Sequence, residues 1–173
     1  MAKKVKTKKF TTESGVEITL TQVKGILVQK ALRSVTMPEH PTYETTTMSG
    51  RVQTLRMDEK AASDTEGGME LWKSYQSELE EAQVEQNNRV MDAVLSTGVD
   101  VDIPDDDEWT EELEAIGLEP RTGRIGRKLD YLSTILGTGD LPEIFKEIMR
   151  LTGAPEEVVK EVEDSFSDSI REE

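Results

Sequence analysis

The side chains that could support chemistry are few in this chain. The sequence has no cysteine and one histidine, His40. Without a thiol there is no cysteine nucleophile, disulfide or thiolate metal ligand. A lone histidine between Glu39 and Pro41 cannot supply a Ser-His-Asp triad or a multi-histidine metal cluster. We therefore expect no catalytic residue, no cofactor and no enzymatic activity.

The densest acidic run, residues 100–108, is the only candidate for a metal site. A calcium loop places oxygen ligands at fixed alternating positions, with a glycine at its sharp turn and a bidentate glutamate at its end. Pro104 lies inside this run, and no glycine follows in register. Asp105 and Glu108 instead resemble a capping box ahead of Trp109, where a helix dipole favours negative charge. We predict a helix start here and no metal site.

One basic cluster lies in the acidic half of the chain. Arg124, Arg127 and Lys128 follow Arg121 and have the spacing of one helical face. Salt bridges to neighbouring acids are the preferred interpretation. A phosphate-binding site is the weaker alternative, because no aromatic residues or glycine-rich cradle accompany the cluster.

Charge is distributed unevenly along the chain. Residues 1–56 hold ten Lys and Arg against four Asp and Glu, and the remainder holds eleven against thirty-two, for a formal net charge of −15. This polarity suits a protein that meets other proteins by charge, and the larger acidic part would repel phosphates. We therefore expect no nucleic-acid partner. No apolar run approaches the ~18 residues of a membrane span, so we expect no membrane partner either.

Two kinds of residue are candidates for binding a partner protein. Residues 1–9 are predicted to form a basic flexible arm, either a solvated tail or an electrostatic contact with an acidic neighbour such as a second copy. Large aromatic residues are rare here and either pack in the core or anchor an interface. The candidate partner-binding residues are Lys3, Lys4, Lys6, Lys8, Lys9, Trp72, Tyr75 and Trp109.

Periodicity predicts the elements that position these residues. Alternation of Val16, Ile18 and Leu20 predicts a strand, with a turn at 13–15 leading back to a partner strand near Phe10. Helical spacing follows over 22–35, and Thr-rich segments on either side of Ser49-Gly50 predict a second hairpin. Further helices are expected over 69–97, from the acidic run to Gly117, over 123–136, from a cap at Asp140 to Gly153, and from Pro155 to about 170.

These elements predict a mainly α, α+β fold. N-terminal β-hairpins with a helix are followed by a C-terminal helical bundle. The expected domains are the basic flexible arm 1–9, a small β-hairpin and helix region 10–57, a linker 58–68 and an acidic helical domain 69–173. The long helix 69–97 has a narrow apolar stripe with a polar gap at Gln86, so it needs other helices beside it.

A series of segments follows one another in a distinctive order along the chain. The segments are Gly15–Leu20, Pro41–Glu44, the Ser-Gly hairpin, the long helix with Trp72 and Tyr75, Gly98–Trp109 and Leu151–Glu157. Their order resembles that of a group of small acidic proteins from the tail morphogenesis gene clusters of long-tailed bacteriophages, some of them called tail assembly chaperones. The resemblance covers about residues 15–170 and contains no catalytic signature. It implies a role in phage morphogenesis or in the virion, and it does not explain the basic arm.

The leading expectation is a non-enzymatic tail assembly chaperone that docks onto amphipathic helices of a tail component, such as the tape measure, in the host cytoplasm. The alternative is a structural virion subunit, a tail or head–tail connector protein. In that case the arm of one copy lies on the acidic half of the next, in a homo-oligomer. A second alternative is an acidic DNA mimic that inhibits a host enzyme. It is disfavoured because helix starts and solvated faces account for most of the acids.

Overall fold

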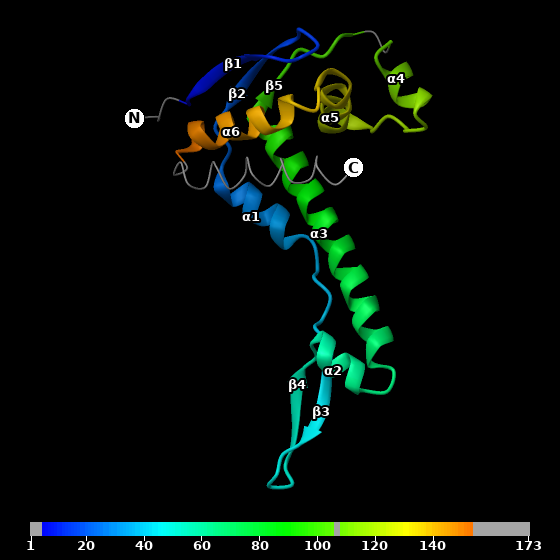
Figure 1. Ribbon diagram of the computed structural model, residues 1–173. Coiled ribbons are helices and arrows are strands. Elements are labelled where there is room, and N and C mark those ends of the chain that lie inside the picture. The colour runs from blue at the N-terminus through cyan, green and yellow to red at the C-terminus, as the bar shows by residue number, and fades with distance from the viewer. Residues whose placement is uncertain (1–4, 106–107, 154–173) are drawn as a thin grey trace. The chain divides into compact units, whose positions relative to one another are not determined.

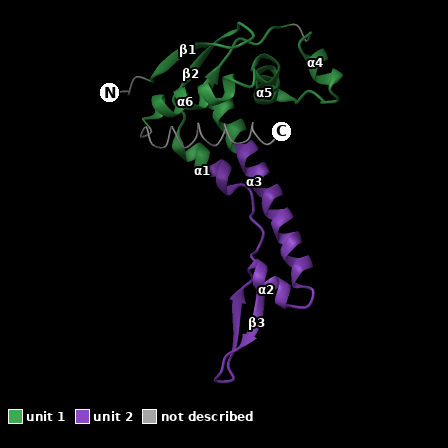
Figure 2. Cartoon of the chain, viewed as in Figure 1, with its two compact units in different colours: residues 1–29, 90–173 green, residues 30–89 purple. Residues whose placement is uncertain are grey.

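The computed structural model describes residues 5–105 and 108–153. The chain forms two compact units, and Figure 2 shows them in different colours. Unit 1 takes the residues up to 29 and from 90 onwards, and unit 2 takes residues 30–89. Six helices and five strands occur in the described residues, which confirms the mainly α, α+β prediction.

A small antiparallel sheet forms one side of unit 1 (Figure 1). β1 (Thr7–Thr11) pairs with β2 (Glu17–Thr21), and β5 (Val99–Asp100) pairs with the other edge of β2. The alternating pattern of β2 buries Ile18 and Leu20, as the sequence predicted. The first hairpin is therefore confirmed. The prediction of a flexible arm is wrong for residues 7–9, because these residues pair with β2 as part of β1.

Four helical segments form one hydrophobic core with this sheet. They are α4 (Thr110–Ala115), α5 (Gly123–Ile135), α6 (Asp140–Thr152) and the last turns of α3 (Gly68–Gly98). Leu132, Ile144 and Ile148 are among their deeply buried residues, and α6 packs against β2. At Gly98 a Cβ would lie 2.7 Å from Val23 Cγ2 and 2.8 Å from Ile148 Cδ1, so a larger residue where α3 ends would force these core side chains to shift.

The predicted helix start in the acidic run is wrong in position. α4 begins at Thr110, with Trp109 at the N-cap and no side-chain capping hydrogen bond. The Trp109 ring is only 9% exposed and packs edge-on against Tyr131 at 5.4 Å between centroids. Burial of this large ring outweighs the smaller gain of a cap at Asp105. The helix ends at Ala115, and Gly117, the predicted stop, follows two residues later with a φ of 79°.

Asp140 ties the β1–β2 turn to the loop between α5 and α6. Its buried carboxylate accepts the backbone N–H of Glu13 at 3.0 Å and that of Gly137 at 2.8 Å. The Ser14 hydroxyl donates to the Ile135 carbonyl, 2.7 Å away, beside this contact. The sequence predicted that Asp140 caps its own helix. In the structure it is the first residue of α6, and its carboxylate joins two distant loops.

Unit 2 contains a β-hairpin, a short helix and most of α3. β3 (Thr42–Thr46) pairs with β4 (Val52–Arg56), and Gly50 adopts a φ of 78° in the turn, which confirms the second hairpin. α2 (Glu59–Asp64) follows, capped by the Asp58 carboxylate at 2.7 Å from Ala61 N. The segment 58–68, predicted as a linker, therefore contains a helix. The helix expected from Pro155 lies outside the described residues.

The two units differ from the predicted domains, which were consecutive segments. The helix α1 (Gly25–Arg33) and α3 each contain a unit boundary. Unit 1 is discontinuous because β5 pairs with β2 and because residues on both sides of unit 2 share one core. Sequence reasoning placed the boundary at composition changes, whereas strand pairing decides it.

Asp140→Ala should destabilise the protein. The substitution leaves the N–H groups of Glu13 and Gly137 without their charged acceptor, at an expected cost of about 2–4 kcal/mol. Urea unfolding would measure the loss. Thr138→Ala is the matched control, because Thr138 is an exposed residue of the same loop. Equal unfolding midpoints for the two variants would contradict the role given to Asp140.

Candidate protein-interaction site

A groove lies along α3 in unit 2. It has a volume of about 570 Å³ and is formed by residues 34–39, which follow α1, and by one face of α3. Apolar side chains and glutamates line it together. The apolar members are Val35, Met37, Pro38 and Ala82, and the acidic members are Glu39, Glu78, Glu81 and Glu85.

A second hollow of about 480 Å³ adjoins this groove on α3. Glu81 and Glu85 line both, and Glu80 adds a further carboxylate. Val84, which is 55% exposed, lies among these acids. This stretch of α3 therefore offers apolar atoms and negative charge together, and a basic amphipathic segment needs both from its partner.

Polar contacts position the groove wall. Gln86 donates from its carboxamide to the Leu32 carbonyl at 2.7 Å. Arg89 donates to the Ser34 hydroxyl at 3.3 Å and holds Glu85 through two nitrogens, at 2.6 and 3.0 Å. The polar gap that interrupts the apolar stripe at Gln86 is thus a contact with the last turn of α1. Sequence reasoning missed the groove, because its two walls are far apart in the chain.

Three rings cluster in unit 2. Tyr75 lies 4.9 Å from His40 and 5.6 Å from Trp72 between centroids, and Trp72 lies 5.9 Å from His40. All three are half-buried. The structure thus brings together two predicted partner-binding residues, Trp72 and Tyr75, one to two turns before Glu78 on α3. Sequence reasoning considered His40 only for catalysis and missed its place in this cluster.

Trp109 occupies a different environment, in the core of unit 1. The Arg127 guanidinium lies 5.8 Å from the centroid of its ring, which is a cation–π distance. Its buried Nε1 has no hydrogen-bond acceptor among the residues that the structure describes. Of the two interpretations, core packing fits Trp109, because its ring presents little surface to a partner.

The predicted arm lysines fall into three groups. Lys8 forms an ion pair with Glu147 at 2.7 Å, and Lys9 forms one with Glu17 at 2.6 Å, so both contact acids of their own chain. Lys6 is exposed. Lys3 and Lys4 lie outside the described residues.

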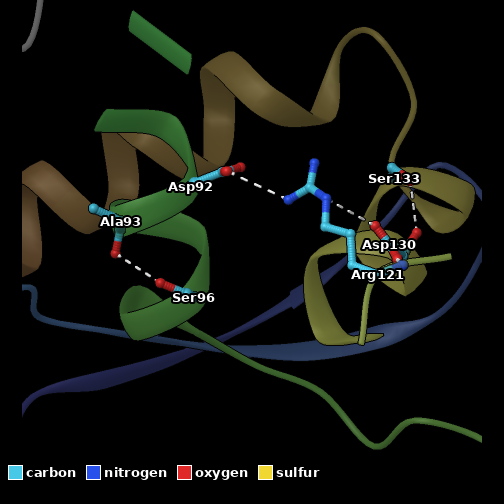
Figure 3. Close-up of polar contacts among 6 residues, drawn as sticks. All are labelled: Asp92, Ala93, Ser96, Arg121, Asp130 and Ser133. Carbon is cyan, nitrogen blue, oxygen red and sulfur yellow. Dashed lines mark hydrogen bonds and ion pairs between the residues drawn. The ribbon is translucent and has the colours of Figure 1, made fainter. Parts of the chain in front are cut away.

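The basic cluster of the acidic half makes internal contacts. Figure 3 shows the Arg121 guanidinium between Asp92 and Asp130, with N···O distances of 3.3 Å to each. The Arg121 N–H also donates to Asp130 at 2.5 Å. Lys128 donates to the Ser96 carbonyl in the last turn of α3 at 2.9 Å, and burial lowers the pKa of its amine despite the nearby Asp100. The ion pairs of Arg121 support the salt-bridge interpretation for that residue, whereas Lys128 binds a backbone carbonyl.

Within the described ranges, no group of three or more His, Cys, Asp or Glu side chains is placed to hold a metal ion. None of the described helices is long and apolar enough to cross a membrane. Comparison of the chain with protein families, curated proteins and solved structures finds no match. The groove and the aromatic cluster beside it are therefore interpreted from their own geometry.

Trp109→Ala should cost about 3–5 kcal/mol of stability, since it truncates a buried aromatic side chain. Trp72→Ala should cost less than half as much, because the Trp72 ring is half-exposed before truncation. Chemical denaturation of the two variants side by side would measure the difference. A larger midpoint shift for Trp72→Ala would show that unit 2 depends on the aromatic cluster more than unit 1 does on Trp109.

The ion pair between Lys8 and Glu147 should make stability depend on pH. The hydrogen bond from Lys8 is the main reason that the pKa of Glu147 lies below its usual 4.5; Arg150 adds to the shift and burial opposes it. Because the folded pKa is the lower one, the stabilisation is fully present above about pH 4.5 and is lost as the pH falls through the folded value. Lys8→Met should therefore lower the free energy of unfolding at pH 7. The difference in this free energy between the variant and the wild type should shrink near pH 3.

The control for this experiment is Lys9→Met. Both members of the Lys9–Glu17 pair are largely exposed, with side chains 74% and 60% accessible, so its loss should have little effect. Urea midpoints of wild type and both variants at pH 7 and pH 3 provide the measurement. If Lys8→Met lowers the urea midpoint by the same amount at pH 7 and at pH 3, protonation of Glu147 is not the cause of the loss.

Proposed function

We propose that this protein is a non-enzymatic assembly factor that binds a basic amphipathic segment of another protein in the α3 groove. The observation that carries the proposal is the combination of an apolar lining with four glutamates in one groove. Apolar side chains of the bound segment contact Val35, Met37 and Ala82. Its lysines and arginines reach Glu39, Glu78 and Glu81, since Glu85 is already paired with Arg89, and these contacts fix the orientation of the segment in the groove.

The physical roles of the two kinds of contact differ. Exposed ion pairs contribute only about 0–1 kcal/mol each, so the glutamates mainly steer the partner and select its charge. The apolar lining and the half-buried Trp72 and Tyr75 beside it supply the affinity, since aromatic residues are frequent anchors of protein interfaces. This division suits an assembly factor that has to release its partner.

The resemblance to phage tail morphogenesis proteins supports a tail component as the partner. In this proposal the protein is a tail assembly chaperone that holds amphipathic helices of a component such as the tape measure in the host cytoplasm. It covers their apolar faces until the tail is built around them. The formal net charge of −15 keeps such a complex soluble by repulsion between copies.

A structural virion subunit, such as a tail or head–tail connector protein, is the second candidate. The observation that favours it is the β3–β4 hairpin, on which every residue of β4 is exposed. The two candidates differ in fate, because a chaperone leaves its partner whereas a subunit remains. The presence or absence of the protein in purified mature particles separates them.

Replacement of Glu78 and Glu81 by lysine should weaken binding to a purified tape-measure segment at least about tenfold, because like charges then meet in the groove. Isothermal titration calorimetry at low and moderate salt would measure it. The matched control replaces Glu111 and Glu112 of α4 by lysine, which makes the same charge change at exposed acids of unit 1.

Equal weakening by both double variants would assign the effect to net charge and contradict the groove. Absence of binding by the wild-type protein to any tail component would contradict the proposed function as a whole.

A further inference from the structure

The β3–β4 hairpin has the properties of an incomplete sheet. In the described part of the chain, β3 is the only strand that pairs with β4. All five residues of β4 are exposed, including Val52 at 63% and Leu55 at 42%. A two-stranded hairpin alone is marginally stable in water, and three or more strands are normally needed.

This edge also lacks the usual protection against pairing. Proteins guard exposed edges with lysine, proline, bulges or inward-pointing charges. The centre of β4, from Val52 to Leu55, reads Val-Gln-Thr-Leu and contains none of these residues, and its pairing with β3 is continuous without a bulge. Thr and Val also favour the extended conformation. The strand is thus suited to accept another strand.

The hydrogen bonds of the hairpin show which backbone groups are free. Thr47 donates to the Arg51 carbonyl, and Met57 donates to the Pro41 carbonyl, each at 2.9 Å. In an antiparallel ladder the bonded positions alternate, so the odd-numbered residues of β4 face β3. The N–H and C=O groups of Val52, Thr54 and Arg56 therefore point to the open edge.

We infer that β4 is a self-association edge: it pairs antiparallel with β4 of a second copy, centred on Thr54 opposite Thr54, to form a four-stranded sheet. In this register Val52 pairs with Arg56 of the partner copy on either side of the centre. Each of these three pairs exchanges two backbone hydrogen bonds. The interface is isologous and closes as a dimer.

Charge selects this edge over the opposite one. In the β4 pairing each Arg56 lies opposite a Val52, so no like charges face one another directly. The equivalent symmetric pairing of β3, centred on Glu44, would place two Glu44 carboxylates opposite each other, which is destabilising. The occupant of the β4 edge is therefore a second β4. The inference does not depend on the α3 groove or on its partner.

A single engineered cysteine tests the register directly, because the natural chain has none. Opposed residues of a bonded pair have Cα atoms about 5.5 Å apart, but their Cβ atoms lie farther apart than an unstrained disulfide allows, so a short bifunctional thiol reagent is the suitable cross-linker. Thr54→Cys should therefore form a covalent dimer when the full-length protein is treated with this reagent. Glu44→Cys is the matched control, since Glu44 lies opposite Thr54 within the hairpin. In the four-stranded sheet the two thiols of the control variant would be about 14 Å apart and should not cross-link.

Proline substitution tests the same edge without covalent chemistry. Thr54→Pro removes an outward N–H and no hydrogen bond of the hairpin itself. It should raise the dimer dissociation constant at least about tenfold by sedimentation equilibrium. Glu44→Pro blocks the β3 edge in the same way and should leave dimerisation unchanged.

Several results would overturn the inference. They are a wild-type protein that stays monomeric at high concentration, open-ended polymers in place of dimers, and equal or reversed cross-linking of the two cysteine variants. A monomeric protein that still binds a tail component would contradict self-association through β4 and leave the proposed function standing. A dimer cross-linked at Thr54→Cys that binds no tail component would support self-association and contradict the proposed function.

Discussion

Unit 1 depends on β2, which is paired along both of its edges. β1 joins it through a local turn, while β5 reaches it from the far side of unit 2 in the sequence. The inward face of β2 supplies Ile18 and Leu20, two of the most deeply buried residues. Because α3 leads directly into β5, this pairing fixes where the last turns of α3 lie, and with them the helices that complete the core.

Charged side chains then hold the loops around this core. Asp130 and Asp140 are buried carboxylates, and each accepts backbone N–H groups from other segments. A buried charge is tolerated only when it is paired and hydrogen-bonded, so these contacts fix loop positions more strictly than apolar packing would. The acidity of the chain thus has two components: a few carboxylates inside unit 1 that are structural, and many on α3 that face solvent.

Local patterns identified most elements, because their causes are local. Alternation predicted β2, Ser49-Gly50 predicted the second hairpin, and Gly117 marked the end of α4. What the patterns could not predict are interactions between distant residues. The β2–β5 pairing made unit 1 discontinuous, and burial of Trp109 shifted the start of α4.

In the candidate site, too, the local features could be predicted and the contacts between distant residues could not. Trp72 and Tyr75 were recognisable as rare aromatic residues at helical spacing. Their neighbour His40 and the wall of residues 34–39 come from another part of the chain, so no periodicity in α3 reveals them. The groove depends on contacts such as the hydrogen bond from Gln86 to the Leu32 carbonyl. In the sequence, Gln86 only interrupts an apolar stripe, so its role is not visible there.

The discontinuity of unit 1 has a consequence for the order in which the chain folds. The β1–β2 hairpin closes a short loop and can form early, whereas Leu20 meets Val99 only after all of unit 2 has been spanned. Closing a long loop costs entropy that grows slowly with its length, and non-local contacts delay folding. Helix formation in α3 before that step stiffens part of the intervening chain. We therefore expect the β2–β5 pairing to form late in folding, after the helical part of unit 2.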